Sequence, residues 1–214
     1  GGSAVYTGVM SGSGALVKTG NGLLALGSAN LFTGGVRLSE GTLQVGSNLA
    51  LGTGTVTLSG GRISSDSVNA RTLANALNLS GVVGLGDSTN SGLLAFSAGA
   101  VLSGDATINA ASAVSFSNAI SGTYGLTKTG AGMVTFSGTN TFSGPVLVGG
   151  GSLVLAGGSA LLNSLAVTVA GSAALRLDAS EEIGSLAGSG TINLQSNRLT
   201  IGGSLNSVLS GAIV

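Results

Sequence analysis

Apolar residues alternate with small polar residues in short bursts along most of this chain. The bursts are marked by Leu24 and Leu26, Val36 and Leu38, Leu43 and Val45, Val56 and Leu58, Val146 and Val148, Leu153 and Leu155, Val167 and Val169, Leu175 and Leu177, Ile192 and Leu194, and Leu199 and Ile201. Alternation with a period of two is typical of a strand that buries one face. Between the bursts lie Gly-Ser, Gly-Gly, Thr-Gly and Asn-containing pairs, which favour tight turns. The pattern predicts many very short strands joined by frequent turns.

A long segment of the chain is repeated 110 residues further on. The matched segments are 11–26 and 121–136, 30–34 and 140–144, and 41–45 and 151–155. Self-similarity of this kind indicates an architecture of stacked units. The function of such a chain is then expected to depend on the length and the surface of the stack rather than on one catalytic pocket.

Two architectures fit short strands with regular turns: an antiparallel sandwich or barrel, and a solenoid whose coils stack on one another. Two sandwich domains would be separated by a linker, yet residues 71–116 keep the strand pattern of their neighbours. We therefore predict an all-β fold, a right-handed parallel β-helix (β-solenoid) that runs continuously through residues 1–214. At roughly 20 to 25 residues per coil, it would have about nine or ten coils. The internal repeat units are expected at about 10–119 and 120–212, as a fragment of a longer repeat array.

The composition supports this fold. Gly occupies 40 positions, and each Gly inside a helix costs roughly 1 kcal/mol relative to Ala, so helices are disfavoured. With 43% hydrophobic residues the chain can still offset the entropy cost of folding, unlike a Gly- and Ser-rich linker. Because a narrow coil has room for few side chains, we expect Leu, Val, Ile and Ala to fill the core and bulky aromatics to be mostly excluded from it.

The charges exclude several classes of function. Seven basic and seven acidic residues cancel, and they are spread singly apart from Glu181 and Glu182. A nucleic-acid surface or a polybasic membrane patch needs clustered Lys and Arg, so neither is expected. The chain has no His and no Cys, which argues against zinc, thiol or imidazole chemistry. No apolar run approaches the roughly 18 residues of a membrane-spanning helix, and no metal or cofactor site is predicted.

Residues 126–144, followed by 146–155, closely resemble the autotransporter-associated β-strand repeat of passenger domains in Gram-negative bacteria. Residues 16–45 resemble a second copy, and residues 183–192 resemble the segment that often precedes another. The motif is fairly specific because it combines Lys, Gly, Asn and aromatic positions. The resemblance implies a type V secretion passenger, a β-helical stalk on the cell surface or secreted, which folds outside the cell after export through a translocator barrel. The resemblance implies no catalytic residues, because the repeat of this family has none.

Two segments of the chain are candidate ligand sites. Lys18 and Lys128 are each followed by Thr, as in a phosphate-binding loop, but neither has the required Gly before it and no helix follows. Both are therefore expected to be solvated lysines on a strand or corner. Residues 84–90 could place several oxygens near a cation, but calcium prefers more carboxylates, so a turn capped by its own side chains is favoured.

Two further groups of residues are candidate sites. Asp178, Glu181 and Glu182 form the acidic cluster, and paired carboxylates can serve glycoside hydrolysis. Without an aromatic platform for sugar, a solvated turn is the favoured interpretation. Asn30 and Asn140 occupy equivalent positions before Phe32 and Phe142, which suggests an amide that bonds the backbone at a corner while the aromatic covers the coil.

The leading hypothesis is a non-catalytic stalk or fibre segment that acts as an extracellular spacer and aids secretion by progressive folding. Its expected partners are neighbouring repeats of the same parent chain and the outer-membrane translocator barrel. The first alternative is an adhesin or self-associating filament that binds glycans or sister fibres through polar ladders or a strand edge. The second is a β-helical polysaccharide-active enzyme, which would need Asp, Arg and Lys clustered on one face; the sequence has only scattered ones.

Overall fold

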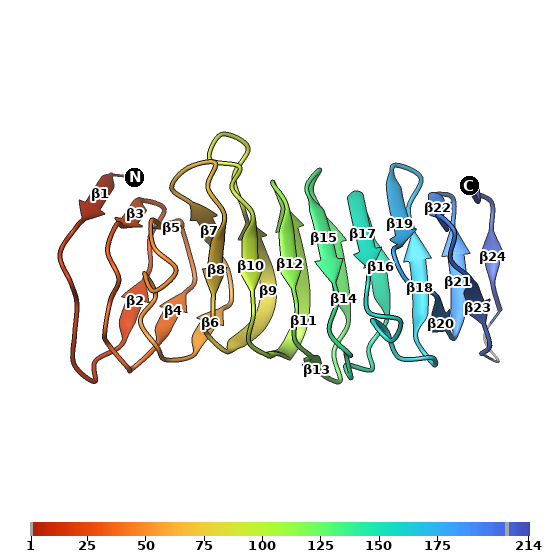
Figure 1. The fold of residues 1–214 in the computed structure, drawn as a ribbon, viewed down its shortest axis with the longest axis horizontal. Coiled ribbons are helices and arrows are strands. Elements are labelled where there is room, and N and C mark those ends of the chain that lie inside the picture. Colours follow the sequence, from red (N-terminus) through yellow and green to blue (C-terminus); the bar gives the residue numbers. More distant parts are fainter. Residues whose placement is uncertain (1, 204–205) are drawn as a thin grey trace.

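The chain folds as a rod of stacked coils, with its two ends at opposite tips of the rod (Figure 1). The computed structural model describes residues 2–203 and 206–214. Over these residues it contains strands and turns but no helix, and every strand pair is parallel. The result is a β-solenoid of about 10 turns, which confirms the fold class predicted from the alternating pattern.

The strands are short, and two longer ones turn a corner between adjacent faces. In chain order they are β1 Ser3–Tyr6, β2 Leu16–Lys18, β3 Leu23–Leu26, β4 Val36–Leu38, β5 Thr42–Val45, β6 Val56–Leu58, β7 Arg62–Ser65, β8 Arg71–Leu73, β9 Leu77–Leu85, β10 Leu94–Phe96, β11 Ala100–Ala110, β12 Val114–Phe116, β13 Ile120–Gly122, β14 Leu126–Thr129, β15 Met133–Phe136, β16 Val146–Val148, β17 Gly151–Leu155, β18 Ala166–Val169, β19 Ala173–Leu177, β20 Glu181–Ile183, β21 Ser185–Gly188, β22 Thr191–Asn193, β23 Leu199–Ile201 and β24 Val208–Leu209. The predicted apolar pairs lie on these strands, except that Leu194 follows the end of β22.

The strands stack in three faces. The first face contains β2, β4, β6, the first parts of β9 and β11, and β13. The second face contains β1, β3, β5, β7, the second parts of β9 and β11, and then β14, β16, β18, β21 and β24. The third face is the sheet of β8, β10, β12, β15, β17, β19 and β22, while β20 and β23 pair separately.

The two repeat copies do not occupy the same faces. Strand β2 of the first copy lies on the first face, whereas its counterpart β14 lies on the second. The shift arises because the 110 residues between them are not a whole number of coils, each of which takes about 20 residues. Equivalent side chains of the two copies therefore point to different sides of the rod.

The core runs the length of the rod and is mostly aliphatic, with inward residues buried and outward ones exposed. On β4, for example, Val36 and Leu38 are buried while Arg37 is exposed. The expectation that aromatics are mostly excluded was wrong, because all five phenylalanines are buried. They are Phe32, Phe96, Phe116, Phe136 and Phe142.

Three of these rings form a ladder across successive coils of the third face. The ring centroids of Phe96 and Phe116 lie 5.1 Å apart with an interplanar angle of 21°. The rings of Phe116 and Phe136 are 5.7 Å apart and meet edge to face at 74°. Both arrangements are favourable for aromatic pairs. The strands stack in register, so each phenylalanine ring packs on the phenylalanine at the paired position of the next coil. This contact accommodates the large rings in the core.

Candidate functional site

Lys128 lies inside the rod, not in solvent. Its side chain is only 1% exposed. The ammonium donates hydrogen bonds to the carbonyls of Thr129 at 3.0 Å, Gly130 at 2.7 Å and Gly150 at 2.8 Å. The last of these belongs to the next coil, 22 residues further along the chain. Lys128 therefore links two coils through the backbone.

Lys18 makes the same contacts in the first copy. Its ammonium donates to the carbonyls of Thr19, Gly20 and Glu40, and its side chain is 8% exposed. The expectation that both lysines are solvated is therefore wrong. An ammonium has three donors, and three carbonyls use all of them. The arrangement leaves no donor for a phosphate.

A glycine in the next coil is needed beside each ammonium. Gly41 and Gly151 have positive φ angles of 70° and 61°. A Cβ at either position would lie 2.5 Å from Nζ of Lys18 or 2.8 Å from Nζ of Lys128. Only glycine combines that conformation with that clearance. The shared Lys and Gly positions of the two copies thus belong to one structural device.

Asn140 bridges three coils at a buried corner. Its Oδ1 accepts the N–H of Ile120 at 2.7 Å, and its Nδ2 donates to the carbonyl of Ala160 at 2.7 Å. Both partners lie 20 residues away in the chain. The N–H of Ala160 in turn donates to Oε2 of Glu181. A polar column thus connects four successive coils.

Asn30 repeats this arrangement in the first copy. It accepts the N–H of Met10 at 2.8 Å and donates to the carbonyl of Ala50 at 2.7 Å. The aromatic residues that follow, Phe32 and Phe142, are both buried in the core. The prediction of a corner amide beside a covering aromatic is confirmed. Asn75, which the sequence analysis missed, plays a similar part by donating to the carbonyls of Gly52 and Gly54.

Replacing Asn140 by alanine is expected to lower the free energy of unfolding by about 2–3 kcal/mol, because one buried N–H and one buried carbonyl lose their partners. Urea unfolding followed by circular dichroism measures the loss. Asn118→Ala is the matched control, since Asn118 is exposed and bonds only the adjacent backbone N–H of Ala119. Equal losses for the two variants would contradict a role for the buried corner.

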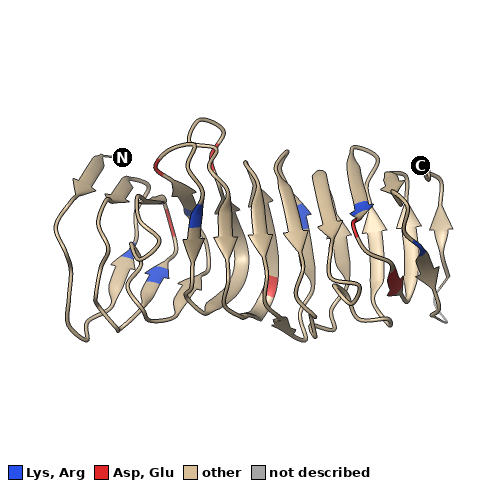
Figure 2. Ribbon diagram, viewed as in Figure 1, with Lys and Arg blue, Asp and Glu red and all other residues tan. Residues whose placement is uncertain are grey.

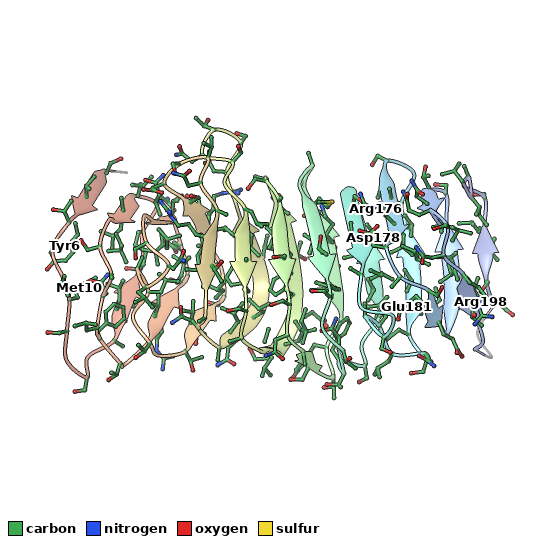
Figure 3. The ribbon with its side chains drawn as sticks, viewed as in Figure 1. Tyr6, Met10, Arg176, Asp178, Glu181 and Arg198 are labelled. Atoms are coloured by element: carbon green, nitrogen blue, oxygen red, sulfur yellow. The ribbon has the colours of Figure 1, made fainter. Side chains whose placement is uncertain are left out.

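The acidic cluster does not converge on one point. Asp178 forms an ion pair with Arg176 through two hydrogen bonds of 2.7 and 2.6 Å, and this contact holds the pKa of Asp178 below its usual range. Glu182 is exposed. In Figure 3 Arg176, Asp178 and Glu181 come from neighbouring parts of the rod, with Arg198 further toward the C-terminal tip. The three carboxyl groups thus have three different environments.

Glu181 is buried, so the interpretation of this segment as a solvated turn is wrong for that residue. Its side chain is 4% exposed, and its carboxylate accepts the backbone N–H groups of Ala160 at 3.0 Å and Leu161 at 3.1 Å. Burial raises the pKa of Glu181, and the two N–H donors partly oppose this rise. A carboxylate that is already bonded to the backbone serves to hold the adjacent coil.

The raised pKa of Glu181 predicts a pH-dependent stability. As the pH falls, the folded chain takes up a proton at Glu181 before the unfolded chain does, so folding is favoured in that interval. Wild type should therefore gain stability relative to Glu181→Gln as the pH falls from 7 towards 4.5, the ordinary pKa of the group. Urea midpoints at several pH values test this. Glu182→Gln, at an exposed position, should show no such trend.

The loop at residues 84–90 is capped from within, as predicted. Oδ1 of Asp87 accepts the backbone N–H groups of Thr89 at 2.7 Å and Asn90 at 3.0 Å, and these bonds lower the pKa of Asp87. Arg62 of the preceding coil donates to the carbonyl of Gly86 at 2.6 Å. Oδ1 of Asp87 thus caps the turn, and the carbonyl of Gly86 is bonded to the preceding coil.

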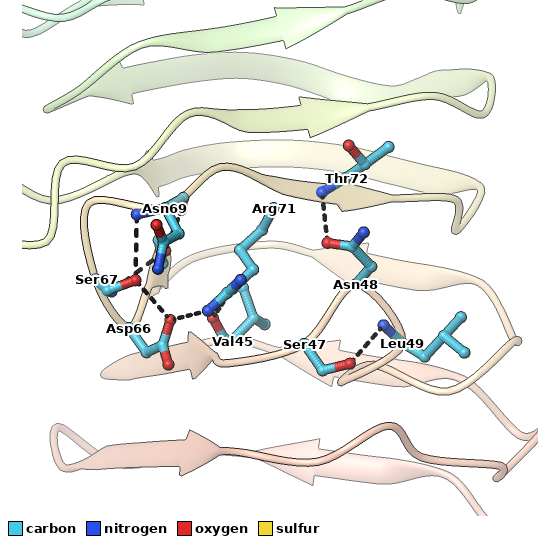
Figure 4. Close-up of polar contacts among 10 residues, drawn as sticks. Val45, Ser47, Asn48, Leu49, Asp66, Ser67, Asn69, Arg71 and Thr72 are labelled. Atoms are coloured by element: carbon cyan, nitrogen blue, oxygen red, sulfur yellow. Dashed lines mark hydrogen bonds and ion pairs between the residues drawn. The ribbon is translucent and has the colours of Figure 1, made fainter.

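A second polar corner lies on the adjacent coil (Figure 4). Arg71 forms an ion pair with Asp66 at 2.6 Å and also donates to the carbonyl of Val45. Asn48 accepts the backbone N–H of Thr72 at 3.0 Å. These side chains again connect one coil with the next, and the ion pair is too exposed to contribute much stability.

Over residues 2–203 and 206–214, no three His, Cys, Asp or Glu side chains lie close enough together to hold a metal ion. The same part of the chain has no helix long and apolar enough to span a membrane. Charged residues are sparse along the rod (Figure 2). Lys128, Asn140 and Glu181 bond the backbone of neighbouring coils, so the geometry defines a parallel β-solenoid in which these buried polar residues support the scaffold.

Comparison with known proteins identifies the repeat. A model of the passenger-associated-transport-repeat matches residues 16–45 and 126–159. The Adhesin BmaC autotransporter of Brucella suis biovar 1 (strain 1330) is 35% identical over 109 residues, which cover 47% of this chain and 3% of that protein. No solved structure matched. Two segments of the chain are thus similar to the passenger-associated-transport-repeat, which confirms the resemblance predicted from the same residues.

Proposed function

We propose that this chain is a non-catalytic stalk segment of an autotransporter passenger, located outside a Gram-negative cell, that spaces other parts of its parent protein from the outer membrane. The observation that carries the proposal is the use of buried polar residues. Lys128, Asn140 and Glu181 each bond the backbone of another coil. These three buried polar side chains thus stabilise the stacking of coils.

The same construction supports a role in export through the translocator barrel. Strands pair with the coil immediately before or after them, at a separation of about 20 residues, so coils can form one at a time. Each added coil buries new apolar side chains, which favours progressive folding outside the cell. The two repeat units, about 10–119 and 120–212, are proposed as equivalent parts of this stalk.

Two deletions in the parent protein, one of a whole coil and one of half a coil, test the proposal. Removing residues 94–113 joins Leu93 to Val114 and leaves every later strand in register, because Leu94 and Val114 are paired. Secretion should persist in this variant, and so should the activity of the parts of the parent protein that the stalk holds away from the membrane. Removing only residues 104–113 shifts the later strands by half a coil and should reduce secretion strongly. Equal secretion of both variants would contradict folding-coupled export, and loss of a specific activity in the first would contradict a spacer.

Adhesion is the second candidate function, because a relative that is similar to part of this chain is named an adhesin. An adhesive segment should bind host cells or glycans when isolated, whereas a spacer should not. Binding of the purified 214-residue chain to cells and glycan arrays separates the two.

A further inference from the structure

One corner of the rod contains an asparagine that is followed directly by a glycine. Asn21 and Gly22 form this pair, and none of the other asparagines of the chain precedes a glycine. They lie in the bend between β2 and β3, near the N-terminal tip in Figure 1, where the chain passes from the first face to the second. Asparagine is a chemically labile residue, and a glycine after it leaves the next backbone nitrogen unshielded by a side chain. The pair is therefore a candidate site of modification.

Asn21 is exposed to solvent. Its position near one tip of the rod is not the cause, because the matched residue of the second copy, Ala131, is exposed too. Ala131 lies just before β15, which pairs with β12 on one side and with β17 on the other. The residue at this position of the repeat thus faces water even inside a continuous stack of coils. Water and base therefore reach the side-chain amide of Asn21.

The packing of the coils fixes the glycine of the pair. A Cβ at Gly22 would lie 2.5 Å from the carbonyl oxygen of Gly2 in the preceding coil, and a Cβ at the matched Gly132 would clash with the carbonyl of Ser112. Both copies therefore need glycine where the two backbones approach each other. The preceding residue is free to vary, since it is Asn in one copy and Ala in the other. The fold thus places a glycine after an exposed residue, and the first copy has a reactive side chain there.

We propose that Asn21 deamidates spontaneously in the folded chain and that this reaction loosens the corner held by Lys18. A base removes the proton of the Gly22 N–H, and the nitrogen attacks Cγ of Asn21. A bond forms between these two atoms, the bond from Cγ to Nδ2 breaks, and ammonia leaves with the proton. Water then opens the resulting cyclic imide at either of its carbonyl carbons, which gives aspartate or isoaspartate. Overall one water is consumed and one ammonia is released, and nothing is oxidised or reduced.

Deamidation alters the surroundings of the buried Lys18. Gly20, which precedes Asn21, bonds the Lys18 ammonium through its carbonyl, and its N–H donates to Oε2 of Glu40 at 3.1 Å. Either product adds a negative charge beside a residue that already bonds a carboxylate, and like charges repel. Isoaspartate also lengthens the main chain by one carbon between β2 and β3, and both of these strands pair with the next coil. The modified corner fits its neighbours less well, so the first copy loses stability with time.

Incubation of the folded 214-residue chain at mildly alkaline pH tests the proposal. Trypsin, which cuts after Lys18 and Arg37, then releases residues 19–37, and mass spectrometry with fragmentation locates the change. Unmodified Asn21 should be lost with time and replaced by two products of equal mass, aspartate and isoaspartate. Asn118 is the internal control, since it is exposed but followed by alanine, and it should stay unmodified over the same period.

Asn21→Ala is the matched variant, because it gives the first copy the residue of the second. After incubation the urea midpoint of wild type should fall, whereas that of Asn21→Ala should not change. The proposal is overturned if Asn21 persists in the folded chain but is lost from a chain unfolded in urea, if Asn118 is lost as fast as Asn21, or if the converted chain unfolds at the same urea concentration as Asn21→Ala. None of these results bears on the spacer role, which the secretion of the deletion variants tests.

Discussion

Replacing Phe116 by alanine is expected to lower the free energy of unfolding by about 3–5 kcal/mol, the usual cost of truncating a buried aromatic residue. Phe116 is the middle ring of the ladder and touches both Phe96 and Phe136. Its side chain is 1% exposed. The variant loses apolar burial and two aromatic contacts, and the rigid stack of coils above and below limits collapse of the cavity.

Urea unfolding of Phe116→Ala measures this loss. Because each coil contacts mainly its neighbours, a weak central coil should also broaden the transition, as the two ends of the rod begin to unfold separately. Tyr124→Ala is the control, since Tyr124 is 45% exposed, and it should change stability by less than about 1 kcal/mol. A loss in Phe116→Ala no larger than this would show that the ring ladder does not stabilise the centre of the rod.

Replacing Lys128 by methionine is expected to lower the free energy of unfolding by about 2–4 kcal/mol at pH 7. Two effects oppose each other. Methionine removes the cost of burying an ammonium, but it leaves the carbonyls of Thr129, Gly130 and Gly150 without their donor. An unsatisfied buried carbonyl costs about 1–3 kcal/mol, so losing three acceptor contacts outweighs the gain.

Arg37→Met is the matched control for Lys128→Met. Arg37 is a basic residue at an exposed strand position, so its replacement should change stability by no more than about 0.5 kcal/mol. Urea midpoints of both variants give the comparison. If Lys128→Met is as stable as wild type, the three carbonyls must find other donors, and Lys128 would not be needed to join the coils.

The pH dependence provides a second measurement on Lys128. Burial lowers the pKa of Lys128 from 10.5 to about 8. Between these two values the unfolded chain holds a proton that the folded chain has lost, so the free energy of unfolding contributed by this group rises with pH. Wild type should therefore gain stability relative to Lys128→Met between pH 8 and 10.5. A constant difference over this range would contradict the lowered pKa.

The buried lysines show how far a local pattern can lead. Leu126 and Lys128 are two residues apart on one strand, so the period of two already places both on the same side. A lysine is nevertheless expected in solvent, because burying an unpaired ammonium is costly. The carbonyl of Gly150 that helps to offset this cost lies in the next coil, and no local pattern indicates it. The burial of Glu181 is not indicated by a local pattern for the same reason, since its donors lie 20 and 21 residues away.

The sequence by itself determined the strands, the parallel β-solenoid and the corner role of Asn30 and Asn140, because alternation, glycine turns and a 110-residue repeat are all encoded along the chain. Tertiary structure alone decided which faces the two repeat copies occupy, and therefore which side chains share a surface. The face that the second copy occupies depends on the summed lengths of all coils and corners between the two copies. An insertion or deletion of a few residues there would place the second copy on another face.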